Sequence, residues 1–364
     1  MEFKRALYQF KQDYWAIGSL LFIIIVTIIA IFADFLAPDK TAYGNQMHLS
    51  IHSKPPGFSC KMLIIPQTKK KKSYLFLSGN NNPNEEIPVQ DIKWFKDYLA
   101  YKRYGNATDY YEKILFSSFL GVANKSVIES SYLIKKQFLL GTDKYGRDLL
   151  SRLLIGSRIS ISIGFVAVFI SLVLGVFFGA IAGYFGGWID RVIMWLINIT
   201  WSIPTLLMVI AITLALGRGF WQVFVAVGIT MWVEVARLVR GQVKSVKEQP
   251  YIQAGAALGF SHVRILSQHI LPMLIAPLIV ISAANFASAI LMESGLSFLG
   301  IGAQPPIPSW GGMVKDHFRY LLLGKPYLAV FPGLAIMSLV LAFMILGNSL
   351  RDAFDVKREI ALMV

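Results

Sequence analysis

Stretches without charged residues divide the chain into apolar windows separated by polar segments. A helix needs about 20 residues to cross the hydrocarbon core of a bilayer, and most of these windows reach that length. The fourth window has only 15 residues, and residues 234–239 complete it. The windows cover residues 14–33, 159–189, 192–217, 219–233, 270–292 and 326–350. The pattern therefore predicts an all-α integral membrane protein with six transmembrane helices.

Glycines and prolines predict where these helices end or bend. The sequence Gly-Tyr-Phe-Gly-Gly at residues 183–187 is typical of a turn, so the second helix is expected to end near Ala182. Pro204 lacks a backbone donor and predicts a kink in the third helix. Three prolines between residues 305 and 308 predict that the charge-free residues 294–314 form a loop.

Composition agrees with a membrane protein and excludes several kinds of chemistry. The chain is 55% hydrophobic and only 15% charged, against about a quarter charged in soluble domains. Its single cysteine, Cys60, excludes an intrachain disulfide. The sequence has no metal-binding histidine spacing, no phosphate-binding G-x-x-x-x-G-K-[ST] and no G-x-S-x-G. We therefore expect no catalytic residue, no metal site and no bound cofactor in this chain.

The distribution of lysine and arginine predicts the topology. With six spans, the side that holds both termini carries twelve Lys and Arg residues, against four in the short loops opposite. Short cytoplasmic loops are enriched in these residues, so both termini are expected in the cytoplasm. The net charge is +14, of which +9 lies in residues 38–158. This outer location of the basic excess gives no reason to expect a nucleic-acid partner.

Residues 38–139 form a long extracytoplasmic insertion between the first and second helices. Residues 62–66 and 73–77 are candidate strands, whereas residues 91–104 and 108–120 are candidate helices, so a small folded subdomain of α+β type is expected. Two interpretations of its basic residues remain open. They either meet a substrate-delivery protein or anionic groups, or they belong to a solvated lid.

The cytoplasmic residues 248–272 predict two short helices separated by a break. Pro250 suits the first turn of a helix, Gly259 suits the left-handed position that ends one, and Ser261 is a suitable cap for the next. Residues 254–257 are all small, which lets another protein approach the backbone closely. The alternative is a hairpin packed on its own helix bundle.

This segment resembles the EAA loop of ABC-importer permeases. Gln253, Ala254 and Gly255 stand where the motif has Glu-Ala-Ala, and Gly259 stands at its glycine. The tail of the motif falls on residues 269–272, His-Ile-Leu-Pro. The resemblance implies a coupling helix that sits in a cleft of a cytoplasmic ATPase. The implied coupling residues are Gln253, Ala254, Gly255, Ala257, Leu258, Gly259, His269 and Pro272.

Three further segments resemble the dipeptide/oligopeptide (peptide/nickel) permeases, and specifically their C-type membrane subunit. Residues 140–148 match L-G-T-D-x-x-G-R-D, residues 293–306 match the outer loop after the fifth span, and residues 350–355 match the terminal L-R-D-x-x-D. Together with the EAA loop, the matches cover about residues 140–356. The insertion is not explained by the resemblance.

The resemblance implies a type I ABC-importer permease that forms half of a translocation pathway for peptides or similar small solutes. Implied partners are a second permease subunit in a heterodimer, two cytoplasmic ABC ATPases that bind ATP, an extracytoplasmic substrate-binding protein and the lipid bilayer. The implied location is the bacterial cytoplasmic membrane. The expected parts are the N-terminus with the first helix (1–37), the insertion (38–139), the permease core (140–350, including the coupling loop 240–272) and a cytoplasmic tail (351–364).

Several side chains have two possible roles. Asn198, Trp201, Ser202 and Thr205 near the Pro204 kink either line the pathway or bond neighbouring helices. Four basic residues recur at helical spacing beside the loop and either touch the ATPase or anchor to anionic lipid; they are Arg237, Arg240, Lys244 and Lys247.

Acidic and small residues in the spans also carry predictions. Glu234 is expected to pair with Arg237 along one helix face, and Glu293 to organise the outer loop. Four glycines along the second helix predict close helix packing: Gly164, Gly175, Gly179 and Gly183.

A secondary transporter or channel is the alternative function. Such a protein usually needs charged residues inside the membrane for an ion or proton path. The apolar windows offer only Glu234 and Glu293, both near helix ends, which argues against this alternative.

Overall fold

The computed structural model describes residues 8–66, 84–106, 108–119, 124–217 and 219–354. The lysine run at residues 69–72 and the predicted strand at 73–77 lie outside the described residues. The chain divides into two compact units. Unit 1 contains Met1–Ile28, Ile159–Gln304 and Leu334–Val364, and unit 2 contains Ile29–Arg158 and Pro305–Gly333.

Long apolar helices dominate the described chain. Five helical stretches are long and apolar enough to cross a membrane, and a sharply bent pair is a sixth span if it is counted as one. The helices are α2 (Tyr14–Ile31), α5 (Leu149–Phe185), the bent pair α6 (Gly187–Ser202) and α7 (Thr205–Leu216), α8 (Phe220–Lys247), α11 (Ile275–Leu299) and α13 (Tyr327–Phe354). Each predicted window therefore corresponds to a helix or to the bent pair.

The third window is broken more completely than the predicted kink. The axes of α6 and α7 differ by 94°. Ile203, the residue before Pro204, has φ −94° and ψ 128°, the extended conformation that a following proline favours. Pro204 also lacks an N–H, so it donates no hydrogen bond back to α6.

The prediction of a loop over residues 294–314 is wrong at both ends. Helix α11 runs on to Leu299 and ends at Gly300, whose φ of 83° is left-handed. A short helix, α12 (Trp310–His317), follows the prolines, and the Ser309 side chain caps it by accepting from the Gly312 N–H. The prolines thus separate two helices.

Glycines let α5 approach its neighbours within unit 1. A Cβ on Gly164 would lie 2.0 Å from the Phe286 ring of α11, and one on Gly175 would lie 2.4 Å from Val235 of α8. Gly179 and Gly183 press against α8 in the same way, at 2.5 and 2.8 Å. The predicted close packing of this helix is confirmed.

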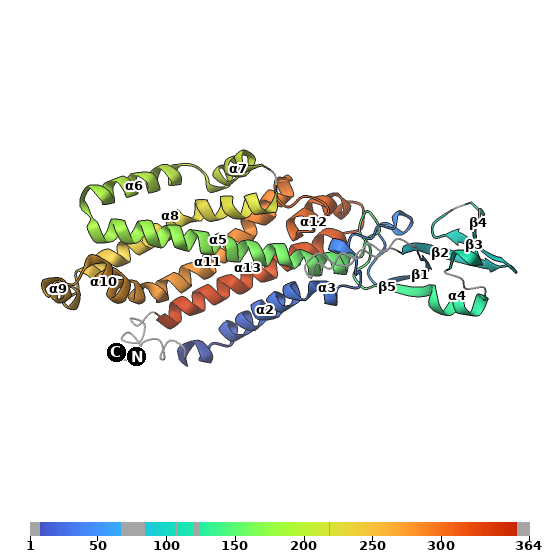
Figure 1. The fold of residues 1–364 in the computed structure, drawn as a ribbon, viewed down its shortest axis with the longest axis horizontal. Helices are drawn as coiled ribbons and strands as arrows, with labels where there is room; N and C mark the ends of the chain where they lie inside the picture. Colours follow the sequence, from blue (N-terminus) through green and yellow to red (C-terminus); the bar gives the residue numbers. More distant parts are fainter. Residues whose placement is uncertain (1–7, 67–83, 107, 120–123, 218, 355–364) are drawn as a thin grey trace. The chain divides into compact units, whose positions relative to one another are not determined.

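Several helices of unit 1 begin or finish at the same end of its bundle. Figure 1 shows α9 (Pro250–Ala257) at the end where α5 and α8 finish and where α2 begins. Helix α13 finishes there as well, and its Ser349 hydroxyl donates to the Asp13 carboxylate just before α2, at 2.5 Å.

Unit 2 contains a five-stranded antiparallel sheet in the order β4-β3-β2-β1-β5. In Figure 1 the short helix α4 (Lys125–Ser131) lies beside it. Its core includes Leu63, Leu99, Phe119 and Ile128, all fully buried. The strands are β1 (Phe58–Ile65), β2 (Glu85–Trp94), β3 (Tyr98–Arg103), β4 (Glu112–Leu115) and β5 (Leu133–Phe138).

The sheet corrects two predicted helices. Residues 91–104 and 108–120 contain strands β3 and β4 and the end of β2. Leu99 and Tyr101 are buried on one face together with Ile114 of the neighbouring strand, the two-residue period of a strand. Tertiary pairing decides the conformation of segments whose local preference is weak. The predicted strand at 62–66 corresponds to the second half of β1.

Candidate functional site

The predicted break between two short helices is present at residues 248–272. Pro250 is the first residue of α9, and Gly259 follows the helix with φ 82°. The Phe260 N–H donates to the Gly255 carbonyl at 3.1 Å, the capping pattern that needs a left-handed residue between them. Ser261 then caps α10 (His262–Arg264) by accepting from the Arg264 N–H. These three local predictions are confirmed.

The second helix is irregular where the sequence predicted the start of a span at residue 270. A π-helical stretch (Ile265–Ile270) and a 3₁₀ turn (Leu271–Leu274) precede α11. Pro272 lies in the turn and donates no hydrogen bond there, so the regular helix begins only at Ile275.

One side of this loop packs on the chain's own bundle. Ile252 of α9, together with Ile265, Ile270 and Leu274, is buried in a single apolar cluster. The other members come from α5 and α8: Ala180, Tyr184, Val235, Val239 and Val243. The loop is therefore held firmly against the ends of α5 and α8.

The partly buried Phe260 ring packs against this cluster. The Arg264 guanidinium carbon lies 4.2 Å from the ring centroid, and the His269 ring stacks on it with centroids 5.8 Å apart. Gly255 faces the same ring, and a Cβ there would lie 3.2 Å from Phe260 Cδ2. The glycine that replaces the second alanine of the motif thus makes room for Phe260.

This geometry makes a prediction about Gly255→Ala. Helix propensity alone predicts a gain of up to about 1 kcal/mol in the free energy of unfolding. We expect no such gain, because the new methyl group crowds a ring that already contacts Arg264 and His269. Thermal unfolding of the purified protein in detergent measures this. The matched control is Gly241→Ala in α8, where a Cβ meets no atom within 4 Å and the gain is expected; equal gains from both substitutions would contradict the prediction.

The other side of α9 and its cap is exposed and carries mostly small or apolar side chains. Gln253, Ala254, Ala257 and Leu258 face away from the bundle, with Leu258 exposed at 76%. Val263, just beyond Gly259, is exposed at 75%. Of the predicted coupling residues, Gly255 thus faces inward, Gly259 and Pro272 are exposed, and His269 is half-buried. The outward side is a small-residue surface that another protein can approach closely.

Residues near the helix break contact the basic row of α8. Arg237 lies 3.6 Å above the Trp201 ring and donates to the Asn198 side chain at 3.3 Å. The predicted alignment of Arg237 with Glu234 is thus replaced by contacts with α6. Ser202 donates to the Ile199 carbonyl, and Thr205 is exposed.

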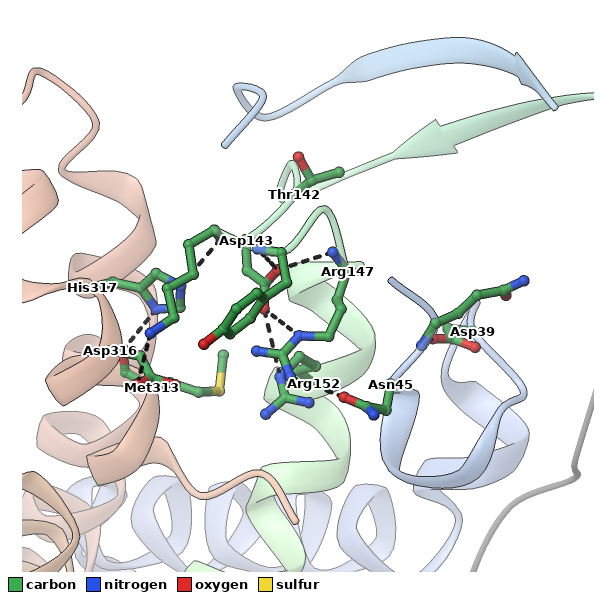
Figure 2. A network of polar contacts seen from close by, with 12 residues as sticks. Asp39, Asn45, Thr142, Asp143, Arg147, Arg152, Met313, Asp316 and His317 are labelled. Carbon is green, nitrogen blue, oxygen red and sulfur yellow. Dashed lines mark hydrogen bonds and ion pairs between the residues drawn. The ribbon is translucent and has the colours of Figure 1, made fainter. Parts of the chain in front are cut away.

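A buried polar network in unit 2 is a second notable site (Figure 2). Asp143 is fully buried, and its carboxylate accepts from the N–H groups of Tyr145 and Arg147 at 2.8 and 2.9 Å. Arg147 Nε also donates to it at 2.6 Å, and Arg152 Nε lies 3.9 Å away. Arg147 continues to Asn45 at 2.9 Å. One carboxylate therefore faces two buried guanidinium groups.

The same loop is bonded to α12. Lys144 Nζ donates to Asp316 at 3.0 Å, and the backbone N–H of Lys144 donates to His317 Nε2 at 3.5 Å. Burial lowers the pKa of His317, so the neutral ring accepts there while Nδ1 donates to the Met313 carbonyl at 2.8 Å. The motif at residues 140–148 was visible in the sequence, but these partners are too distant along the chain to be predicted.

Glu293 contacts a residue that bonds the loop after α11. It is buried in α11, and the Ser297 hydroxyl donates to it at 2.6 Å. The same hydroxyl accepts from the Ala303 N–H at 3.3 Å. Glu293 thus supports the residues that follow α11. In the described ranges, no cluster of His, Cys, Asp and Glu side chains is placed to hold a metal ion.

Comparison with known proteins matches most of this chain to one kind of membrane protein. The family model described as binding-protein-dependent transport system inner membrane component matches residues 175–359. The model described as N-terminal TM domain of oligopeptide transport permease C matches residues 2–56. All five strands of the sheet lie between these two matched ranges.

Individual proteins are also similar to this chain. The dipeptide transport system permease protein DppC of Alkalihalophilus pseudofirmus is 42% identical over 219 residues, which are 60% of this chain and 72% of the relative. The glutathione transport system permease protein GsiD of Pectobacterium atrosepticum is 40% identical over 218 residues, with the same coverage. A chain from a solved inward-facing structure of the MetNI methionine ABC transporter is 20% identical, with a TM-score of 0.44, and the match covers 55% of this chain and 96% of that one.

Proposed function

Because the chain belongs to the family of inner-membrane components of binding-protein-dependent transport systems, as a C-type permease of the dipeptide/oligopeptide ABC importers, we propose that it carries peptides or peptide-like solutes and contacts its ATPase through residues 248–272. The chain is a multi-pass inner-membrane permease subunit of an ATP-driven importer, and it is not an enzyme. Its family implies a partner ATPase and a substrate-binding protein.

The observation that supports the coupling role is the two-sided loop. Its inner side is held to α5 and α8 by a buried apolar cluster, so a displacement of α9 displaces those helix ends. Its outer side carries exposed apolar and small side chains, with Leu258 the most prominent on α9 and its cap. A surface of this kind fits a partner protein that seats α9 in a cleft and moves it when ATP closes the ATPase dimer.

The position of the loop determines the membrane topology in this proposal. The start of α2 and the end of α13 lie at the same end of the bundle as α9 (Figure 1). If α9 meets a cytoplasmic ATPase, both termini are cytoplasmic and residues 38–139 are extracytoplasmic, as the lysine and arginine distribution also favours. A second permease subunit completes the pathway in this proposal.

The substrate class rests on the relatives, whose names specify dipeptide and glutathione transport. Both are short peptides or peptide-like molecules. Asn198, Trp201, Ser202 and Thr205, beside the break between α6 and α7, are the proposed pathway residues. Non-helical backbone at membrane depth occurs where it is buried in protein or lines a water-filled cavity, and Trp201, Ser202 and Thr205 are exposed.

The proposal is tested by isolating the tagged chain from its native membrane and identifying its companions by mass spectrometry. Two ATPase subunits, a second permease and a binding protein are expected. The complex, reconstituted in proteoliposomes, should take up labelled di- and oligopeptides only with internal ATP. Uptake by the chain without ATPase subunits would instead support a secondary transporter or channel, which no comparison favours.

A further inference from the structure

We propose that Asp190 is a positioning residue that passes the movement of the coupling loop to the bent helix pair α6–α7. This inference rests on the proposed function, because it concerns how a displacement of α9 reaches the pathway. It reassigns the basic residues of α8 from contacts with lipid or the ATPase to ties within the permease.

Asp190 joins the first turn of α6 to the last part of α8. It is buried, at 8% exposed, and its carboxylate accepts from both Nε and Nη2 of Arg240, the latter at 2.8 Å. Lys244, one turn further along α8, donates to the same carboxylate at 2.7 Å. Charge-assisted, two-point bonds of this kind fix orientation as well as distance.

The tie continues to the coupling loop. Lys247, the last residue of α8, donates to the Tyr184 carbonyl at 2.5 Å, and the Tyr184 hydroxyl bonds His262 Nδ1 at 2.9 Å. His262 begins α10, directly after the Gly259 break. The last turn of α8 joins this pair of bonds to the one at Asp190, because Lys244 and Lys247 both lie on it.

The other end of α6 is also tied to α8. Arg237 lies over Trp201 and bonds Asn198, one turn before the helix ends at Ser202. Held at both ends, α6 must move with α8, and its last residues carry that movement to the break at Ile203 and Pro204. Movement of the loop therefore reaches the break, where the proposed pathway residues lie.

Apolar contacts support α6 independently of Asp190. Ile193 and Ile197 of that helix are buried against Ala182, Val233 and Ala236, and this apolar contact does not depend on the carboxylate. Loss of Asp190 leaves two cations whose side chains are already 24% and 41% exposed, so water can reach them. We therefore expect Asp190→Ala to fold and assemble.

The test uses the complete importer in proteoliposomes and measures peptide imported per ATP hydrolysed. Asp190→Ala should reduce this ratio about tenfold, the factor that about 1.4 kcal/mol of lost coupling represents, with the ATPase still bound and hydrolysis within about twofold of the parent. Asp190→Asn keeps the shape but not the charge, so its ratio should lie between those of Asp190→Ala and the parent. Asp190→Glu should restore most of the ratio.

The matched control is Glu234→Ala, which removes an exposed carboxylate from α8 and should leave the ratio unchanged. An unchanged ratio in Asp190→Ala would overturn the proposal, and so would loss of folding or ATPase binding in all three variants, which would show a purely structural role. A parent complex without ATP-driven uptake would instead overturn the proposed function, and this inference with it.

Discussion

Replacing Asp143 by alanine is expected to lower the free energy of unfolding by about 3–5 kcal/mol, the usual cost of removing one partner from a buried ion pair. Asp143 is fully buried, and the guanidinium groups of Arg147 and Arg152 are nearly so. Without the carboxylate, two cations face each other in a region that water does not reach. The backbone N–H groups of Tyr145 and Arg147 lose their acceptor in the same substitution.

Thermal unfolding in detergent, followed by circular dichroism, measures this effect. Asp143→Asn should be less damaging, because an amide oxygen still accepts from the backbone. The control is Asp109→Ala, which removes an exposed aspartate paired with Lys102 and should leave the unfolding midpoint unchanged. Equal midpoints for Asp143→Ala and the parent would show that the network contributes nothing to stability.

The network also marks a limit of sequence reasoning. The motif at residues 140–148 was recognisable, yet its partners Asn45 and Asp316 lie 102 and 172 residues from Arg147 and Lys144. Nothing in local pattern connects such positions. Gly146 of the motif shows the same limit. A Cβ on this residue would lie 1.8 Å from the His48 carbonyl oxygen, a contact that only the fold reveals.

Features that depend on local chemistry were predictable. The apolar windows were found because a bilayer requires about 20 apolar residues per helix, and the loop's break was found because Pro250, Gly259 and Ser261 act on their own backbone. The strands at residues 91–115 were missed, since their burial depends on pairing across the sheet. The inward direction of Gly255 was missed for a related reason, because it depends on where Phe260 returns after the turn.

The basic residues of α8 have partners that their spacing in the sequence did not indicate. Lysines and arginines at helical spacing beside a cytoplasmic loop are typical of lipid or protein contact, and the sequence left both open. In the structure Arg240 and Lys244 meet Asp190, and Arg237 meets Trp201. A single aspartate in the neighbouring helix binds Arg240 and Lys244, and its separation from them, 50 and 54 residues along the chain, conceals this contact from the sequence pattern.

A second large effect is expected from Leu258→Glu at the exposed side of the coupling loop. Leu258 caps α9 through its backbone, and its side chain is 76% exposed, so the substitution should not affect folding. If α9 seats in the ATPase, Leu258 becomes buried there, and burying a leucine contributes about 1.5–3 kcal/mol. A carboxylate in the same place adds the cost of burying a charge. The affinity for the ATPase should therefore fall by about 10- to 100-fold or more.

Binding of purified ATPase subunits to the immobilised permease complex measures this affinity directly. Leu322→Glu is the matched control, because Leu322 is exposed at 93% in the segment between α12 and α13, which the proposal places outside the cytoplasm. That variant should bind the ATPase as the parent does. Because Leu258 is the most exposed apolar side chain of α9 and its cap, an unchanged affinity in Leu258→Glu would mean that the ATPase docks elsewhere, and the buried inner side of the loop would then serve only to close the bundle.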